Sequence, residues 1–191
     1  MEFNEHSNLK GKHAFLGASK YHWLNYDIKK LLTTYENSLA VERGTRLHAL
    51  ASELISLGIK LPKTADTLNT YVNDAIGFGM RPEQVLYYSD NCFGTADTIL
   101  FNERRKILRI HDLKTGETPA HMEQLEIYAA LFCLEYGVNP LDIRYELRIY
   151  QTNKVIVHNP NPEAIRNIME IIVNFDKVLD EYKAKGEFPN E

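Results

Sequence analysis

Cysteine is scarce in this sequence, and the scarcity excludes several kinds of metal site and disulfide framework. Cys92 and Cys133 are the only two cysteines. Two thiols are too few for a four-thiolate iron–sulfur cluster, and their spacing matches no zinc motif. Because both lie in apolar runs, we expect buried free thiols in a reducing compartment and no iron–sulfur cluster.

Long hydrophobic runs and flexible linkers are also absent. No apolar stretch approaches the ~18–20 residues that a membrane-spanning helix requires, so we predict no membrane association. The start, Met1 to His6, lacks the basic and then apolar order of a secretion signal, which makes the cytoplasm the expected location. Since no stretch is rich in Pro, Gly and Ser, we predict a single domain over residues 1–191.

The chain lacks an excess of basic residues as well. Its formal net charge is −4 at pH 7, which argues against broad, nonspecific coating of nucleic acid, because such affinity comes from Lys and Arg contacts with phosphates. Basic residues do gather locally, within residues 10–30 and within residues 104–109. Either cluster is a candidate DNA contact, and either is equally well explained as a solvated face.

Hydrophobic periodicity predicts an α/β fold in which helices come first. The N-terminal helical part covers about residues 15–80, with a break expected at Asn37-Ser38. Its predicted helices are Ala18–Tyr35, Val41–Leu57 and Ala65–Phe78.

A sheet core is predicted over about residues 84–158. Its expected strands are Gln84–Ser89, Cys92–Leu100, Lys106–Lys114, Ile143–Gln151 and Val155–His158. Helical periodicity interrupts the strands at Ala120–Tyr136. Asn161-Pro162 is typical of a helix start, with Asn161 as the cap, and predicts a C-terminal helix over about residues 162–185.

Two carboxylates and a lysine stand at the ends of adjacent predicted strands. Side chains alternate along a strand, so Asp112 and Lys114 share one face and His111 points to the other. Asp97 lies in the preceding strand, and the loop 101–105 is short enough to pair the two strands as a hairpin. That pairing brings Asp97 and Asp112 together.

Carboxylates held close repel each other, and a hard divalent cation such as Mg²⁺ or Mn²⁺ relieves the repulsion. Such an ion suits a phosphodiester, because it neutralises a phosphate oxygen and lowers the pKa of a bound water. The Lys114 ammonium can then stabilise charge that develops in the transition state. An isolated Asp-x-Lys is usually a surface pair, so the surrounding residues decide between the two interpretations.

Two helices supply further candidates. Gln124 and Tyr128 are four residues apart, so both can face one cleft. His48 lies on the preceding helical pattern beside the stripe expected to be buried, which consists of Leu47, Leu50, Ala51, Leu54 and Gly58. A lone histidine there is more often a core residue than a ligand, although imidazole is a competent ligand for Mn²⁺.

In this order, the residues resemble the PD-(D/E)XK nuclease superfamily, in its RecB-like branch with lambda-type and CRISPR-associated exonucleases and small phage relatives. The motifs that carry the resemblance are Gly44-Thr45-x-x-His48, Gly94-Thr95-Ala96-Asp97, Asp112-Leu113-Lys114-Thr115-Gly116 and Gln124-x-x-x-Tyr128. One departure is Asp112, where many members have Glu.

The resemblance implies a restriction-endonuclease-like core, a mixed central sheet flanked by helices. It implies that His48, Asp97, Asp112 and the backbone carbonyl of Leu113 ligate Mg²⁺ or Mn²⁺. It makes Lys114 the catalytic lysine, with Asp97 and Asp112 as catalytic carboxylates and with Gln124 and Tyr128 as the active-site pair of a helix.

The implied activity is DNA hydrolysis in recombination, repair or phage DNA processing, in a bacterial host cytoplasm if the gene belongs to a phage. We expect an exonuclease, because the low overall charge favours binding at strand ends, where residues 20–26 mix aromatic and basic side chains. A recombinase or a single-strand-binding protein is an expected partner, and the oligomeric state stays open.

Three alternatives remain. The protein can be a structure-specific or single-strand endonuclease, or a noncatalytic nucleic-acid-binding subunit that keeps the nuclease fold. The dipeptide His111-Asp112 also suggests an HD-type phosphohydrolase, but that reading needs both residues on a helix with other histidines converging.

Overall fold

The structure, a computed structural model, describes residue 7 and residues 11–185. The chain divides into two compact units, Met1–Arg43 and Gly44–Glu191. Helix α1 (Ile28–Leu57) begins in the first unit and ends in the second.

The described part of the first unit contains a 3-10 segment, η2 (Ala18–Asn25), and the start of α1. The indole N–H of Trp23 donates to the Gly17 carbonyl at 3.0 Å. Asp27 Oδ1 accepts a hydrogen bond from the Lys30 N–H at 2.7 Å, which satisfies a free donor in the first turn of α1.

Two predictions for this region were wrong. Residues Ala18–Tyr35 do not form one helix, because η2 ends at Asn25 and α1 begins only at Ile28. The expected break at Asn37-Ser38 is absent, and α1 runs through it. The Ser38 hydroxyl donates to the Tyr35 carbonyl at 2.7 Å, so it bonds within the helix. Asn and Ser lower helix propensity by only a fraction of a kcal/mol, which neighbouring turns easily offset.

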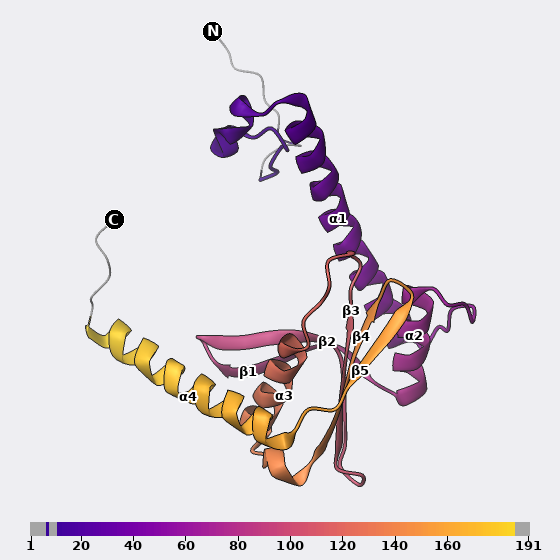
Figure 1. Ribbon diagram of the computed structural model, residues 1–191, viewed down its shortest axis with the longest axis vertical. Coiled ribbons are helices and arrows are strands. Elements are labelled where there is room, and N and C mark those ends of the chain that lie inside the picture. The colour runs from indigo at the N-terminus through magenta and orange to yellow at the C-terminus, as the bar shows by residue number, and fades with distance from the viewer. Residues whose placement is uncertain (1–6, 8–10, 186–191) are drawn as a thin grey trace. The chain divides into compact units, whose positions relative to one another are not determined.

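The second unit is built on a five-stranded mixed sheet in the order β1-β2-β3-β4-β5. The strands are β1 (Arg81–Ser89), β2 (Cys92–Asn102), β3 (Ile107–Leu113), β4 (Arg144–Gln151) and β5 (Lys154–His158). Only β3 and β4 pair in parallel, and α3 (Glu123–Tyr136) connects them (Figure 1). The predicted α/β class, the β2–β3 hairpin and the order of elements are confirmed.

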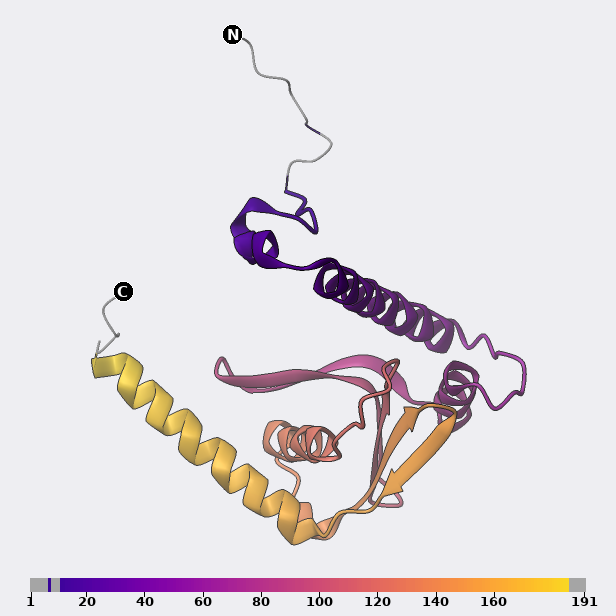
Figure 2. The ribbon, with the colours of Figure 1, turned by 45° about the horizontal axis from the view of Figure 1, so that its top comes forward.

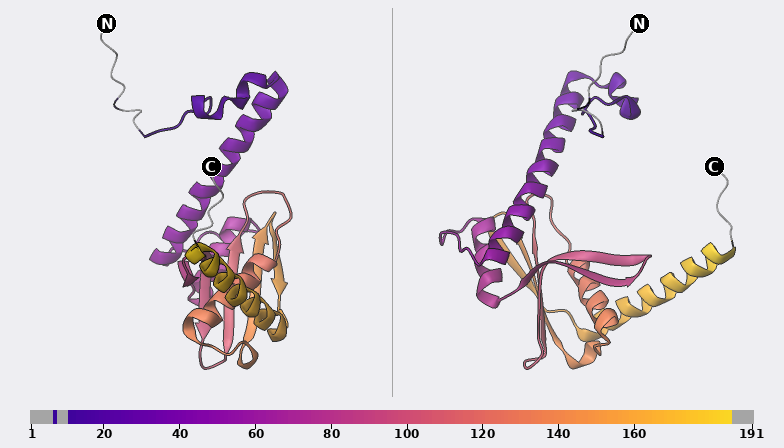
Figure 3. Two further views of the ribbon diagram at one scale, coloured as in Figure 1. Left: turned by 90° about the vertical axis from the view of Figure 1, so that its left-hand side faces the viewer. Right: turned by 180° about the vertical axis from the view of Figure 1, so that it is seen from behind.

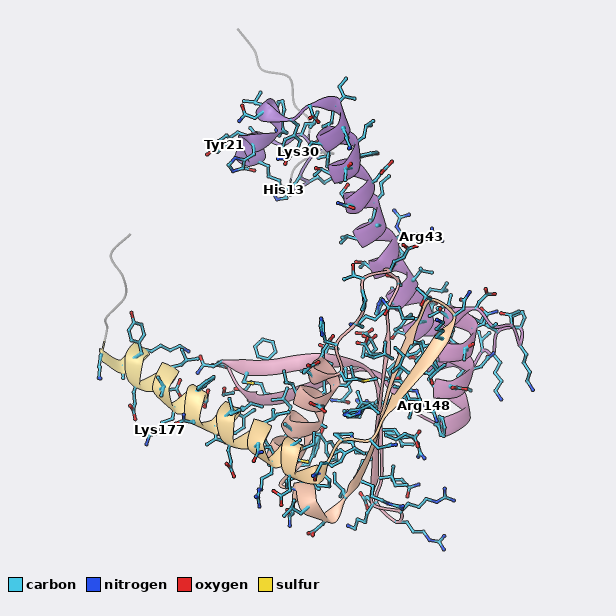
Figure 4. All side chains as sticks on the ribbon, viewed as in Figure 1. His13, Tyr21, Lys30, Arg43, Arg148 and Lys177 are labelled. Atoms are coloured by element: carbon cyan, nitrogen blue, oxygen red, sulfur yellow. The ribbon has the colours of Figure 1, made fainter. Side chains whose placement is uncertain are left out.

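Helices pack on both faces of this sheet. Helix α3 packs on one face and contacts α4 (Pro162–Lys185), whereas α2 (Thr67–Phe78) packs on β3 and β4 from the other face (Figure 1). The predicted cap of α4 is present, since Asn161 Oδ1 accepts from the Glu163 N–H at 3.0 Å. Many of the side chains in this unit lie between the helices and the sheet, with Arg148 on β4 and Lys177 out on α4 (Figure 4).

Alternation along β3 divides the core into two clusters. Leu108 and Ile110 belong to a cluster with α3, whereas Leu113 belongs to a cluster with α2 and the end of α1. The α3 cluster also contains Leu86, Ala129, Leu147 and Ile165, and the α2 cluster contains Ala51, Tyr71, Val72 and Tyr150. Each face of the sheet is therefore anchored independently.

The β1–β2 hairpin extends beyond the other strands and passes over α3 (Figures 2 and 3). Ala96 and Ile99 are an odd number of residues apart, yet both pack in the α3 cluster, so β2 twists sharply between them. On β1, Glu83 has a φ of +49° between the pairs Pro82↔Thr98 and Gln84↔Ala96. The ribbon is thus distorted at Glu83 and Asp97, which lie opposite each other.

The cysteines are free thiols in different surroundings. Cys133 is buried as expected, with its Sγ 3.7 Å from the Tyr145 hydroxyl. The same expectation was wrong for Cys92, which is only half-buried because it lies near the tip of the β1–β2 hairpin. As to the helices, none within residues 11–185 combines the length and the apolar character that crossing a membrane requires.

Removing a core side chain should reveal how strongly the sheet depends on the α3 cluster. Leu147 is fully buried on β4, so Leu147→Ala should lower the free energy of unfolding by about 2–5 kcal/mol. Leu141→Ala is the matched control, because Leu141 is 42% exposed and should change stability by less than about 0.5 kcal/mol. Urea titration measures both, and equal losses would contradict the described core.

Candidate active site

The candidate site begins where β2 and β3 separate. Their last backbone pair is Thr98↔His111. Asp97 is the residue before Thr98 on β2. Its carboxylate takes the place of a backbone partner, since its Oδ2 accepts a hydrogen bond from the Leu113 N–H at 2.8 Å. This bond fixes the Asp97 side chain between the two strands.

Helix α1 brings His48 to the same carboxylate. His48 Nδ1 lies 3.3 Å from Asp97 Oδ2, and the His48 side chain is 31% exposed. The expected buried stripe of α1 was partly wrong, because Leu50 is 44% exposed. Gly58 is exposed as well. The buried residues on this part of α1 are Gly44, Ala51 and Ile55, and His48 lies in line with Ala51 and Ile55, as the helical spacing predicted.

Glu83 is a member of the site that sequence reasoning missed. One ligand atom each from His48, Glu83 and Asp97 lies within 4.8 Å of the others. Glu83 precedes the predicted start of its strand, and the positive φ that directs its carboxylate follows no local pattern. Its only signal was an acidic residue at the start of the strand that pairs with the strand of Asp97.

Asp112 and Lys114 form an ion pair beside this cluster, in which the carboxylate is buried and the lysine side chain is 29% exposed. Asp112 is 2% exposed. Lys114 Nζ donates to Asp112 Oδ1 at 3.1 Å and lies 2.9 Å from Oδ2. Within the described part of the chain, Oδ2 has no hydrogen-bond partner of its own.

The predicted helix pair continues from Lys114. Its ammonium also donates to Gln124 Oε1 at 2.9 Å, and Gln124 Nε2 donates to the Tyr128 hydroxyl at 3.0 Å. One chain of hydrogen bonds therefore joins Asp112, Lys114, Gln124 and Tyr128. The Lys114 ammonium is held on two sides, by Asp112 and by Gln124.

The electrostatics of the site indicate an excess of negative charge. Burial, and then the charge of Asp97, raises the pKa of the Asp112 carboxyl, although Lys114 opposes the shift. Burial and Asp97 likewise raise the pKa of Glu83. The hydrogen bond to Asp97 raises the pKa of His48 against the effect of its own burial. A bound cation would relieve this repulsion.

Leu113 contributes through its backbone. Its N–H holds Asp97, while its side chain is buried in the α2 cluster. The role of its carbonyl as a metal ligand stays a prediction.

Close steric contacts explain why glycine is found at two positions of the predicted motifs. A Cβ at Gly44 would lie 2.8 Å from Thr115 Oγ1, so a larger residue there would force the Thr115 side chain to move. A Cβ at Gly94 would lie 2.9 Å from Tyr128 Cε1, so glycine in β2 makes room for the Tyr128 ring.

Gln151 was not predicted and holds the loop between Lys114 and α3. Its Nε2 donates to the carbonyls of Gly116 and Thr118 at 2.6 and 2.7 Å, and its Oε1 accepts from the Ala120 N–H at 3.3 Å. Because the Gln151 side chain is almost fully buried, this loop has a defined path from the lysine to the helix of Gln124.

His111 lies on the opposite face of β3, as the alternation predicted. Its Nδ1 is 3.2 Å from the Tyr150 hydroxyl, and its ring meets Phe78 edge-on. Burial, together with the charges of Arg148 and Arg109, lowers its pKa to about 3. A neutral core histidine on a strand does not fit the HD-type alternative.

Comparisons with protein-family models, with curated proteins and with solved structures find no match to this chain.

The raised pKa of Asp112 gives a prediction about stability in EDTA. A carboxyl whose pKa is raised by folding stabilises the protein below its unfolded value of 3.8, and this contribution is lost as the pH rises through the folded value. Asp112→Asn removes that loss, so the variant should be more stable than the wild type at pH 7, and the two should converge toward pH 4.

Thermal unfolding between pH 4 and pH 8 measures this difference. Glu103→Gln, at an exposed turn, is the control and should show no such pH-dependent gain. The described site would be contradicted if the Asp112→Asn variant lost stability relative to the wild type between pH 4 and pH 7.

Proposed function

We propose that this protein is a Mg²⁺- or Mn²⁺-dependent deoxyribonuclease with a restriction-endonuclease-like core, similar to the RecB-like branch of the PD-(D/E)XK superfamily. The observation that carries the proposal is the convergence of Asp97, Asp112 and Lys114 where β3 ends and separates from β2. Buried like charges are costly, and a structural scaffold has no physical need to keep them together.

The donor set supports a hard divalent cation. His48, Glu83 and Asp97 offer one imidazole and two carboxylates, and the nearby Asp112 offers another carboxylate, which is paired with Lys114. Oxygen-rich ligands with a single imidazole suit Mg²⁺ or Mn²⁺ better than they suit softer metals. A bound cation would neutralise a phosphate oxygen and acidify a water molecule.

Lys114 is the residue that we assign to the transition state. Asp112 and Gln124 hold its ammonium by two hydrogen bonds, and Tyr128 in turn holds Gln124. A cation fixed in advance stabilises charge developing on a phosphate without the cost of ordering a long flexible side chain during the reaction. Gln124 and Tyr128 are thus positioning residues for Lys114.

DNA is the proposed substrate, and cleavage from an end is the proposed mode. With a net charge of −4, affinity for the middle of a duplex should be low, so productive binding depends on the site and on contacts with a strand end. A single-strand endonuclease is the alternative. A recombinase or a single-strand-binding protein would supply processivity in recombination, repair or phage DNA processing.

Incubation with DNA tests the activity directly. Linear DNA should be degraded in Mg²⁺ or Mn²⁺ and remain intact in EDTA, and Lys114→Ala should lower the rate by about 10²–10³-fold, the effect of losing one preorganised charge-stabilising group. Lys154→Ala, on an exposed strand, should cut at the wild-type rate. Undiminished cleavage by the Lys114 variant would reject the assignment, and equal cutting of covalently closed circles would reject the exonuclease mode.

His48 tests the ligand set separately from the activity. If its imidazole binds Mn²⁺, His48→Ala should lose most of the rise in melting temperature that Mn²⁺ gives the wild type, because binding to the folded state alone stabilises it. His121→Ala is the control, since that side chain is 85% exposed. The same Mn²⁺-induced rise in both variants would place the ion away from His48.

A further inference from the structure

The β1–β2 hairpin carries an exposed aromatic pair further along the same two strands that supply Glu83 and Asp97 to the candidate site. Backbone pairing sets Val85 opposite Thr95 and Tyr87 opposite Phe93. Because side chains alternate, these four residues lie on the face away from the buried Leu86. We call this face, formed by Val85, Tyr87, Phe93 and Thr95, the hairpin face.

The aromatic pair is unusually open. Phe93 is 63% exposed and Tyr87 46% exposed. Their rings are stacked, with centroids 6.4 Å apart and planes 28° apart. The Tyr87 hydroxyl donates to Asp90 Oδ1 at 2.9 Å, which restrains the tilt of its ring. Two exposed rings that stack in this way present π surface to a planar ligand.

The backbone beneath the pair is braced. The Tyr87 N–H donates to Glu135 Oε2 of α3 at 2.9 Å. At the tip of the hairpin, Ser89 and Asn91 both donate to Asp176 of α4. The rings therefore stand on a hairpin tied to two helices, and a ligand that binds them pays little to order the protein.

The edge of β1 is built against pairing with another strand. Pro82 lacks an N–H, Glu83 has a positive φ, and the register shifts between Tyr87 and Ser89. Such features prevent a second chain from adding to a sheet edge. This leaves the exposed π surface of the hairpin face, rather than its edge, as the binding feature.

We propose that Tyr87 and Phe93 form a stacking platform for the bases of a single DNA strand whose phosphate lies at the candidate site. The inference rests on the proposed nuclease function. Phe93 is four residues from Asp97, roughly 13 Å along a strand, which is about the length of four stacked nucleotides at 3.4 Å each.

The chemistry of the hairpin face favours bases over other ligands. Val85 and Thr95, between the site and the rings, are uncharged, so this stretch suits base edges better than phosphates. Stacking on aromatic rings requires unpaired bases and tolerates any sequence. The platform would therefore select single-stranded or frayed ends, and it accounts for end binding by a chain without net positive charge.

The test is binding of single-stranded DNA without cleavage. A fluorescein-labelled 12-nucleotide strand is titrated with the full chain at low salt in Ca²⁺, a cation that can offset the carboxylates of the site. Anisotropy gives the dissociation constant, and gel electrophoresis checks that the strand stays intact. The double variant Tyr87→Leu/Phe93→Leu keeps apolar surface and removes the rings, and it should bind at least about tenfold more weakly, since stacking of each base on a ring contributes to the affinity. The two single variants should each show part of the loss, and they replace the double variant if it fails to fold.

Two controls separate stacking from other effects. Phe175→Leu removes a ring that is 62% exposed on α4 and should leave the affinity unchanged. A strand with abasic sites should bind the wild type about as weakly as the normal strand binds the double variant.

The proposal is overturned if the wild type does not bind the strand, if abasic and normal strands bind equally, or if both ring variants bind like the wild type. It is also overturned if sedimentation shows that Phe93→Leu dissociates a dimer, because the hairpin face would then be covered by a second copy. Since the assay needs no catalysis, failure of the wild type to cut DNA in Mg²⁺ or Mn²⁺ would reject the nuclease and leave the binding result standing.

Discussion

Crowding of negative charge where β3 separates from β2 is the constraint on which the rest of the second unit depends. The Leu113 N–H fixes the carboxylate of Asp97, and Asp112, the residue before Leu113, is buried. Such a carboxylate is costly to ionise, and the pKa shifts of Asp112 and Glu83 express that cost. Lys114 and His48 offset part of it from opposite sides. The surrounding fold must hold these groups in place against their repulsion.

The two core clusters provide that support from the two faces of the sheet. The α3 cluster places Gln124 and Tyr128 beside Lys114, and the cluster with α2 and the end of α1 places His48 beside Asp97. Glycine at two close approaches, and Gln151 on the connecting loop, keep the parts in register. Packing and hydrogen bonds from separate elements thus hold the side chains of the site in defined positions. Such preorganisation suits electrostatic stabilisation, which works best with groups that need not move.

What the sequence could predict was local in origin. Alternation along β3 correctly separated Asp112 from His111, and a short loop correctly predicted the β2–β3 hairpin. Glu83 and Gln151 were missed, because their roles depend on a positive φ and on a loop folded back from a distant strand. The expected break in α1 was wrong, since weak helix formers are overruled by the turns around them. On α1, periodicity alone could not fix which way the helix faces to within one residue, and Leu50 proved exposed.

We propose that Glu83, Asp97 and Asp112, together with His48, hold one divalent cation. Anomalous diffraction from a crystal grown with Mn²⁺ tests it most directly, because the signal locates the metal without assuming its ligands. The account predicts a peak within bonding distance of His48 and Asp97, with Asp112 or Glu83 completing the contacts. A peak elsewhere on the protein, with none among these residues at saturating Mn²⁺, would contradict it.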